Sequence, residues 1–420
     1  MKWFSRLFSI AVLGLALPAA AEAPDALLRS LAAEAADNNA DIQAARREVD
    51  AARNRVSPAA ALDDPMLELG LLNVPAESLS LRKEEMTMKM VGLAQRLPYP
   101  GKRALRREVA EKELEAAENN LREAVNKVQR EVKMAYFDLG QVDEMARLVQ
   151  KNRGIVEQLL SIAESRYGVG QTSQADVLKA QTQLSKMLDE LLKIGRERPM
   201  IEAELNRALG RGPGAPPVAP QPLRAREVAL RLDELREAAR QSRPQLLAQQ
   251  SMIARSAKQL DLARKDYYPD FDVRFSYGQR DNYLEMRRED MISLTVAINL
   301  PIWRGSKLEP RVSEAEAMRE QASRMYQAKL NEIDAMLRRE VAGAEQSLKS
   351  VRLYESGILP QARLAVDASL SAYRVGRADF PMLLDSQMAV FNYELGYLTN
   401  VASQNKALAE IEFLTGKALF

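Results

Sequence analysis

Few residues in this 420-residue sequence carry the side chains that catalysis or metal binding usually requires, because it contains neither histidine nor cysteine. Their absence excludes disulfides, thiolate chemistry, the usual zinc sites and any nucleophile paired with histidine. The acidic residues Asp63, Asp64, Asp270 and Asp272 have no partner at a spacing that would suit general acid and base catalysis. We therefore expect no catalytic residues, no cofactor and no enzymatic activity.

One group of soft ligands remains. Met86, Met88 and Met90 alternate along a short segment, and thioethers suit Cu(I). Such a stripe is more often plain apolar surface, so we interpret it as the face of a strand that contacts lipid. The sequence thus predicts no metal site.

The chain is organised around a stretch that occurs twice. Residues 166–178 return as residues 372–384, and the register is fixed by pairs 206 residues apart, namely Tyr167 with Tyr373 and Gly170 with Gly376. Each copy reads as a long helix that ends at a glycine, which can take the left-handed conformation. A new helix then follows, capped by Thr172, Ser173 or Asp379. Each copy therefore predicts the tip of a helical hairpin.

The repeat extends over the whole chain after its first residues. We expect a signal peptide over 1–21, a first structural repeat over 22–209, a linker rich in glycine and proline over 210–224, and a second repeat over 225–420. The leader has a basic start, an apolar segment and small residues at its end, with cleavage after Ala21. No cysteine stands at that junction, so we expect an exported protein that is not a lipoprotein.

Each repeat is predicted to contain a helix, two strands, a long helix and a return helix. The helices other than the final one are expected at 24–56, 102–166, 174–209, 225–265 and 307–373, the first ended by Pro58. In the second of these, apolar residues are spaced alternately by three and four, as in the narrow seam of a left-handed coiled coil: Val125, Val128, Val132, Ala135, Leu139, Val142, Ala146 and Val149. Unbroken, that helix would be about 95 Å long.

The strands are expected at 66–73, 86–96, 270–279 and 291–300. In the second repeat, apolar and polar residues alternate strictly, and each run has about the 9 to 11 residues that a tilted strand needs to cross a bilayer. Aromatic residues at the strand ends would lie on one level, as at a membrane interface: Tyr99, Tyr267, Tyr268 and Trp303. The alternative is an ordinary half-buried sheet that packs against helices.

Four strands are too few to close a barrel around water. Lipid tolerates no open sheet edge, so several chains must contribute to one barrel if these strands cross a membrane. Charge gives no other indication of a partner: lysine and arginine number 60 against 58 acidic residues, a net charge of +2, which does not mark a nucleic-acid binder.

With this order of elements, the chain resembles the TolC family of outer membrane efflux proteins. The sharpest marks are the two Tyr-x-Val-Gly tips, and the Pro-x-Pro-Gly-Lys-Arg corner at 98–103 is similar to that of the heavy-metal efflux branch. The resemblance implies a homotrimer with a twelve-stranded outer membrane β-barrel, continued by a long α-helical coiled-coil barrel in the periplasm. It further implies a periplasmic adaptor protein and an inner-membrane pump of the RND type.

The resemblance also assigns roles to residues of the tips. The adaptor would dock on Val169, Gly170, Gln171 and Thr172 and on Val375, Gly376, Arg377 and Ala378. Asp176, Tyr373 and Asp385 would form the gate and the acidic lining of the tunnel entrance. This sequence departs from the family where Met382 stands in place of a second acidic residue and Ala378 in place of an arginine.

The function that follows is a passive exit duct of a tripartite efflux system, with metal cations among its possible cargo. Two alternatives stay open: a duct for type I protein secretion, which would share the fold, and a periplasmic structural coiled-coil protein that forms no channel.

Overall fold

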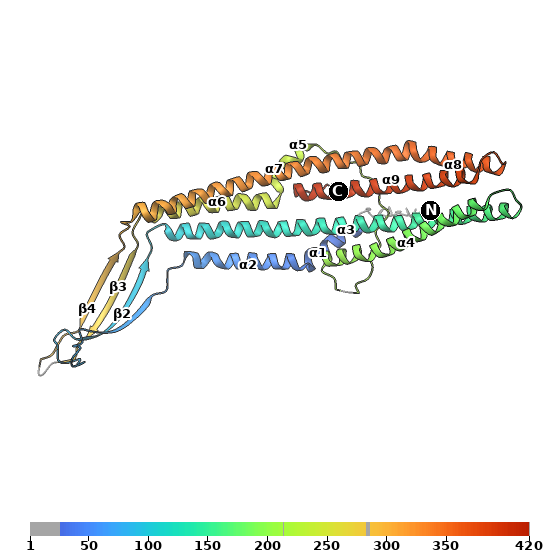
Figure 1. Ribbon diagram of the computed structural model, residues 1–420. Coiled ribbons are helices and arrows are strands. Elements are labelled where there is room, and N and C mark those ends of the chain that lie inside the picture. Colours follow the sequence, from blue (N-terminus) through green and yellow to red (C-terminus); the bar gives the residue numbers. More distant parts are fainter. Residues whose placement is uncertain (1–25, 213, 283–285, 420) are drawn as a thin grey trace, which may run out of the picture.

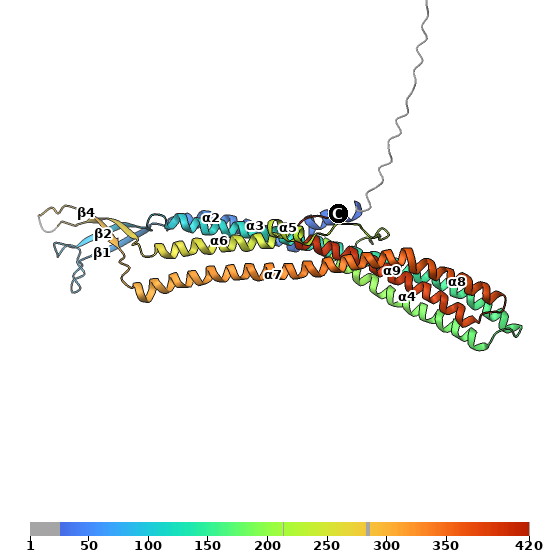
Figure 2. The same cartoon turned by 90° about the horizontal axis from the view of Figure 1, so that it is seen from above.

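The structure is a computed structural model that describes residues 26–212, 214–282 and 286–419. The molecule is elongated, with a sheet at one end and the tips of two helical hairpins at the other (Figure 1), and it stays narrow when seen from above (Figure 2). The helices are α1 (Ala26–Asn38), α2 (Ala40–Ala60), α3 (Lys102–Gly168), α4 (Gln174–Leu209), α5 (Leu232–Ser242), α6 (Pro244–Lys265), α7 (Glu309–Leu353), α8 (Leu359–Arg374) and α9 (Phe380–Thr415). The expected signal peptide lies outside the described residues.

The four strands form one antiparallel sheet in the order of the sequence. They are β1 (Met66–Leu72), β2 (Met88–Leu97), β3 (Phe271–Gln279) and β4 (Met291–Ile298), so β1 and β4 are the two edges. The four predicted strands are confirmed, with ends that differ by up to two residues. In the described ranges the strands pack mainly against one another, and no helix covers the sheet, which projects from the helices in Figure 1. The alternative of a sheet packed against helices is therefore wrong.

Helix α3 is the continuous strut of the molecule, with 67 residues and a length of about 100 Å. Most of the predicted seam is buried, including Val128, Val132, Leu139 and Val149. Near its middle, however, Tyr136 and Phe137 are buried too, because α3 packs against α1, α2, α4, α6 and α9. The seam prediction was too narrow there, since a helix with neighbours on several sides buries more than one stripe.

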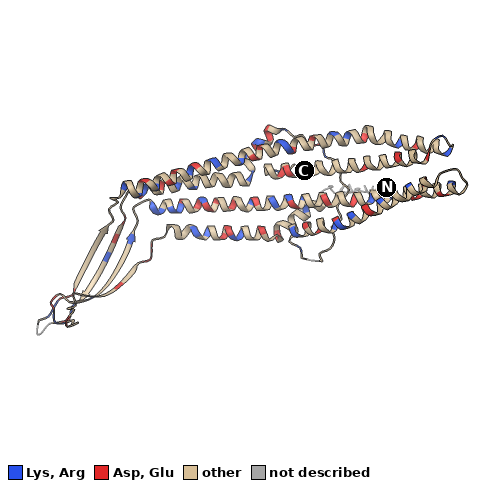
Figure 3. Cartoon of the chain, in the orientation of Figure 1, with Lys and Arg blue, Asp and Glu red and all other residues tan. Residues whose placement is uncertain are grey.

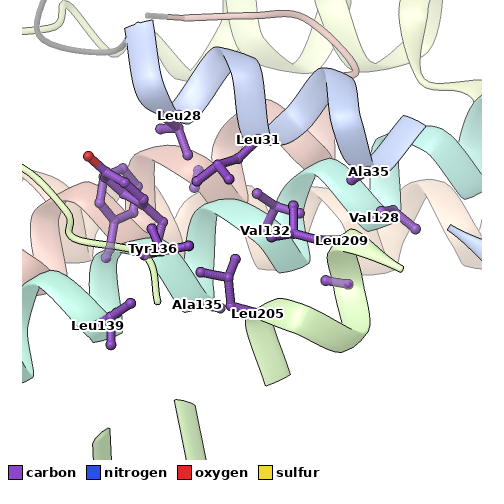
Figure 4. Packing of buried hydrophobic residues seen from close by; sticks show 14 of the residues in the cluster. Leu28, Leu31, Ala35, Val128, Val132, Ala135, Tyr136, Leu139, Leu205 and Leu209 are labelled. Atoms are coloured by element: carbon purple, nitrogen blue, oxygen red, sulfur yellow. The ribbon is translucent and has the colours of Figure 1, made fainter. Parts of the chain in front are cut away.

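The core that surrounds the middle of α3 joins the four helices of the first half, α1 to α4, and includes Ala409 of α9. Leu28 and Leu31 of α1 meet Val132 of α3 and Leu205 and Leu209 of α4, as Figure 4 shows. A second core lies between the tips, and a third joins α5, α7 and α9. Apolar contacts thus run along the whole helical part.

The helix predicted over 24–56 is in fact two helices. Asn39 separates α1 from α2, because its side chain accepts hydrogen bonds from the backbone of Asp41 and Ile42 and so caps α2. The second helix also continues through Pro58 to Ala60, so the prediction that Pro58 ends it was wrong.

The helix predicted over 225–265 begins only at Leu232 and is broken at Arg243. Residues 224–226 are held extended by two buried side chains of α9. Asn405 donates to the carbonyl of Arg224, and Gln404 accepts from the amide of Arg226. A local propensity for helix is overridden here by contacts with a distant segment.

The helix predicted over 307–373 contains two π-helical turns, Arg304–Leu308 and Tyr354–Ile358. Each stands two residues before a proline, Pro310 and Pro360. A proline inside a helix removes one backbone donor and its ring crowds the preceding turn, which a wider turn relieves. The helix nevertheless runs without a break from Arg304 to Arg374, so the second half has a strut like that of α3, with two wider turns in it.

Both return helices end at a glycine in the left-handed conformation, Gly210 with φ +72° and Gly416 with φ +67°. Each glycine packs against the backbone at the junction of two other helices, α1 and α2 for Gly210 and α5 and α6 for Gly416. A Cβ on Gly210 would lie 2.5 Å from the carbonyl oxygen of Asn38, and a Cβ on Gly416 2.7 Å from that of Ser242. The same junction thus occurs once in each half of the chain.

Candidate membrane surface and docking tips

One face of the sheet is apolar across all four strands. The strand register aligns Leu69, Val91, Tyr277 and Ile292 in one transverse row and Leu67, Leu93, Phe275 and Leu294 in another. These side chains are exposed, from 40% for Tyr277 to 72% for Leu69. Polar residues enter this face only toward the strand ends, where Lys89 pairs with Asp281 at 3.3 Å. An uncovered apolar surface of this kind marks a contact with lipid or protein.

The opposite face is polar. Glu68 of β1 and Arg274 of β3 form an ion pair at 3.2 Å across β2, and Ser276 and Ser293 lie on the same side. Charged residues are few in the sheet compared with the helices, as Figure 3 shows, and β4 contains none. The sheet therefore has two faces of opposite character.

The methionines Met88 and Met90 do not lie on the apolar face of the sheet, although we expected the three methionines to form a lipid-facing surface. Met90 pairs with Gly278 and Gly70, so it lies on the polar face with Arg274. The sulfur of Met88 occupies the space above Gly278, 2.5 Å from where a Cβ would stand. These methionines fill notches left by glycines, whereas Met86 precedes the strand.

Aromatic residues gather where the strands join the helices. Tyr99 stacks on Tyr268 with ring centroids 4.6 Å apart, and the ammonium group of Lys265 lies 5.6 Å from the ring of Tyr99 and 5.3 Å from that of Tyr268. Tyr267 is half-buried beside them, and Trp303 is exposed between β4 and α7. The topology thus places all four predicted aromatics at one end of the sheet.

The same junction is fixed by an ion pair that sequence reasoning missed. The buried ammonium group of Lys102 contacts Asp270 at 2.8 Å, and Asp270 also accepts a hydrogen bond from the amide of Tyr99. The residues come from the start of α3 and the start of β3, so no sequence motif joins them.

At the far end of the molecule, both predicted hairpin tips are present. Gly170 and Gly376 have φ of +73° and +71°. In both tips the glycine amide donates a hydrogen bond to the carbonyl three residues before it. The amide of the next residue donates to the carbonyl five residues before it, and the two bonds together form the Schellman motif. Ser173 and Asp379 cap α4 and α9 as expected.

The predicted docking residues lie at these tips. Val169 and Val375 are 68% and 69% exposed although both are apolar, and Gln171 and Arg377 are exposed beside them. Thr172 and Ala378 are half-buried. Nothing in the described chain lies within 4 Å of a Cβ built on Gly170 or Gly376. The tips therefore present two small apolar knobs that the rest of the chain does not cover.

Asp176 and Tyr373, which were predicted to form part of a gate, make no hydrogen bond to each other within the chain. Asp176 accepts from Thr172 and Ser173 in a capping box. Burial raises the pKa of Asp176, but these hydrogen bonds outweigh it and hold the pKa below its usual value. Asp176 is therefore the second member of the capping box of α4 in the single chain, whereas Asp385 is exposed on α9 and faces Lys179 of α4.

Tyr373 is buried between Phe380 and Arg166, and its hydroxyl has no hydrogen-bond partner among the described residues. Arg166 lies over the tyrosine ring at 4.3 Å and donates to the carbonyls of Tyr373 and Arg374. It thereby links the end of α3 to the end of α8. The repeat pattern could not reveal this clamp, because Ala372 stands at the matching position in the second copy.

The family described as outer membrane efflux protein matches residues 31–211 and 235–417, most of the chain. The chain belongs to this family. The resemblance seen in the sequence is therefore confirmed, as is the fold class of long helices with a small antiparallel sheet.

Among other family proteins, the cobalt-zinc-cadmium resistance protein CzcC of Cupriavidus metallidurans is 22% identical over 91% of this chain and 88% of its own length. Protein CyaE of Bordetella pertussis is 27% identical over 57% of this chain, and the match spans about half of CyaE, 52%. The outer membrane protein VceC of Vibrio cholerae shares the fold with a TM-score of 0.79 at 19% identity, over 94% of this chain and 97% of VceC.

Solved outer membrane channels share this efflux-protein fold, and they are channels rather than enzymes. Among the described residues, no helix combines the length and apolar character needed to span a membrane. In the same part of the chain, no three side chains of His, Cys, Asp or Glu are grouped to hold a metal ion.

Proposed function

We propose that this protein is the outer membrane exit duct of a tripartite efflux system. The observation that carries the proposal is the uncovered sheet, whose apolar face crosses all four strands and stands at one end of helices about 100 Å long. The sheet sits in the outer membrane, and the helices extend into the periplasm. The protein carries cargo without chemistry of its own.

The duct is a homotrimer. Both edge strands, β1 and β4, have a free side in the single chain, and an open edge in lipid leaves backbone groups unpaired. Three copies joined edge to edge close a twelve-stranded sheet whose apolar faces point outward and whose polar faces enclose water. The stacked tyrosines Tyr99 and Tyr268 then lie at the periplasmic interface with lipid, together with Tyr267 and Trp303.

The tips are the docking surface for a periplasmic adaptor protein, which joins the duct to an inner-membrane pump of the RND type. Exposed Val169 and Val375 lie in the turns that follow α3 and α8, at the end of the molecule opposite the sheet, where a partner can reach them. The cargo includes metal cations, a proposal supported by the likeness to CzcC over 88% of that protein.

The test uses the full chain, extracted from membranes in detergent. We expect a particle with the mass of three chains and discrete current steps when it is added to a planar lipid bilayer. A monomer that stays soluble without detergent and gives no current would refute the proposal and favour the structural coiled-coil protein. Loss of metal tolerance on deletion of the gene, restored by the wild-type chain, would support metal cations as cargo; unchanged tolerance would refute that part alone.

A further inference from the structure

The start of each return helix carries one member of an ion pair that links the two halves of the chain. Lys179 lies in α4 and Asp385 in α9, 206 residues later, so they occupy the same position in the two copies of the tip sequence. The ammonium group of Lys179 lies 3.0 Å and 3.2 Å from the two carboxylate oxygens of Asp385. One position of the repeat thus holds opposite charges that face each other.

The pair stands at the end of a groove between α4 and α9 with a volume of about 670 Å³. Apolar side chains such as Leu384 and Phe391 contribute to its walls, and its charged residues are two cations and two anions: Lys179, Lys186, Glu190 and Asp385. Met382, one turn before Asp385, is exposed and uncharged. The groove therefore has no excess of either sign.

The other acidic residues of the tips are offset in number by arginines. Asp176 belongs to the capping box of α4 and Asp379 caps α9, so both lie at the tips with their carboxylates hydrogen-bonded. Arg374 and Arg377 add exposed positive charge at the second tip. The single chain thus offers no local surplus of carboxylates near Asp385.

We infer that Lys179 neutralises Asp385 and that the entrance of the duct is charge-balanced, so that it does not select cations. This inference rests on the proposed function, because it concerns the charge that permeating ions meet. The contact itself is exposed and contributes little to stability. Compensation does not require a permanent contact, because both charges stay well within the screening length of about 10 Å at 0.1 M salt.

In a trimer, three lysines and three aspartates alternate around the entrance. Because Lys179 and Asp385 stay within one screening length of each other, ions in the lumen meet the field of both charges together. Choice of cargo then belongs to the pump and adaptor, and the duct passes ions of either sign.

The test is the reversal potential of single channels in a KCl gradient, for wild type, Lys179→Gln, Asp385→Asn and the double variant. A control, Lys193→Gln, removes the same charge from α4, where Lys193 pairs with Asp189 of its own helix at 2.7 Å. We expect weak selectivity in wild type and in the double variant, cation preference in Lys179→Gln, and anion preference in Asp385→Asn. A change in local potential of about one kT alters the cation-to-anion ratio about sevenfold.

Two results would overturn the charge pair and leave the proposed duct intact. One is normal opening of the Lys179→Gln channel with the selectivity of wild type, and the other is an equal shift in selectivity in Lys193→Gln. Strong cation selectivity in wild type would also overturn it. Trimers that insert and never conduct, in any variant, would overturn the proposed duct and with it this inference.

Discussion

Gly210 ends helix α4 at a point where a single added methyl group meets two separate obstacles. Its φ of +72° is the left-handed conformation, which costs a residue with a Cβ about 1–2 kcal/mol. The new Cβ would also lie 2.5 Å from the carbonyl oxygen and 2.8 Å from the carbonyl carbon of Asn38. Overpacking of a fixed backbone costs a further 1–3 kcal/mol, roughly. We therefore expect Gly210→Ala to destabilise each chain by about 2–5 kcal/mol.

The neighbouring backbone cannot easily move away from that methyl group. Asn39, next to the contact, is buried, and its side chain donates to the carbonyl of Ala208 at 2.9 Å while it caps α2. A shift of Asn38 would disturb α1, α2 and the last turn of α4 together. The full cost of the contact with Asn38 should therefore appear as lost stability in Gly210→Ala.

Two further glycines separate the two costs. Gly170 has nearly the same φ, +73°, but nothing within 4 Å, so Gly170→Ala should lose only the left-handed cost of about 1–2 kcal/mol. Gly195 lies inside α4 with ordinary helical geometry and open space, so Gly195→Ala should gain about 0.5–1 kcal/mol.

The assay is urea unfolding of the detergent-extracted protein, followed by helical circular dichroism, with the three variants compared at equal protein concentration. Hydrogen exchange at the amides of α1 and of the last turn of α4 should quicken only in Gly210→Ala. Equal losses in Gly210→Ala and Gly170→Ala would refute the reasoning, because the contact with Asn38 would then contribute nothing.

Four other outcomes are expected. Glu123→Ala leaves the buried Arg243 without the carboxylate that it contacts at 2.8 Å, so the free energy of unfolding in urea should fall by about 3–5 kcal/mol. The double variant Glu123→Leu with Arg243→Met should recover most of that stability, and a double variant as unstable as Glu123→Ala would contradict this expectation. Leu294→Arg, on the apolar face of β4, should cost about 2–4 kcal/mol and prevent membrane insertion, while Ser293→Arg on the polar face inserts normally; equal membrane fractions would count against that assignment. Gly376→Glu should abolish efflux and binding of the adaptor while trimers still reach the membrane, whereas lost trimers would indicate a folding role instead. Because the pKa of Asp176 is lowered, its contribution to stability is present above the usual Asp range and is lost as the pH falls through the lowered pKa, so melting curves of Asp176→Asn should show a weaker acid dependence than wild type.

Sequence reasoning succeeded where the cause is local. Left-handed turns at Gly170 and Gly376 and the caps Ser173 and Asp379 follow from the residues themselves, and two-residue alternation fixed the apolar face of β3 and β4. These features depend on neighbours in sequence, which a pattern can read.

It failed where distant segments decide. Tyr167 and Tyr373 match in sequence, but the first is 48% exposed and the second 3%, because only Tyr373 has Phe380 and Arg166 against it. The face of Met88 depends on the register with Gly278, and the late start of α5 on Gln404 of another helix. The charge pair of Lys179 and Asp385 could have been found, since a comparison at the repeat distance places the two residues together.

The different surroundings of those two tyrosines make the tips of one chain unequal. One tip exposes a tyrosine beside its valine, and the other exposes an arginine beside its own. The proposed trimer would then offer six docking points of two kinds in alternation. A partner that tolerates both kinds binds with a stoichiometry of two per chain, whereas one that requires the tyrosine binds once per chain. Counting the adaptors on a single duct would therefore show whether both tips of a chain are recognised or only one.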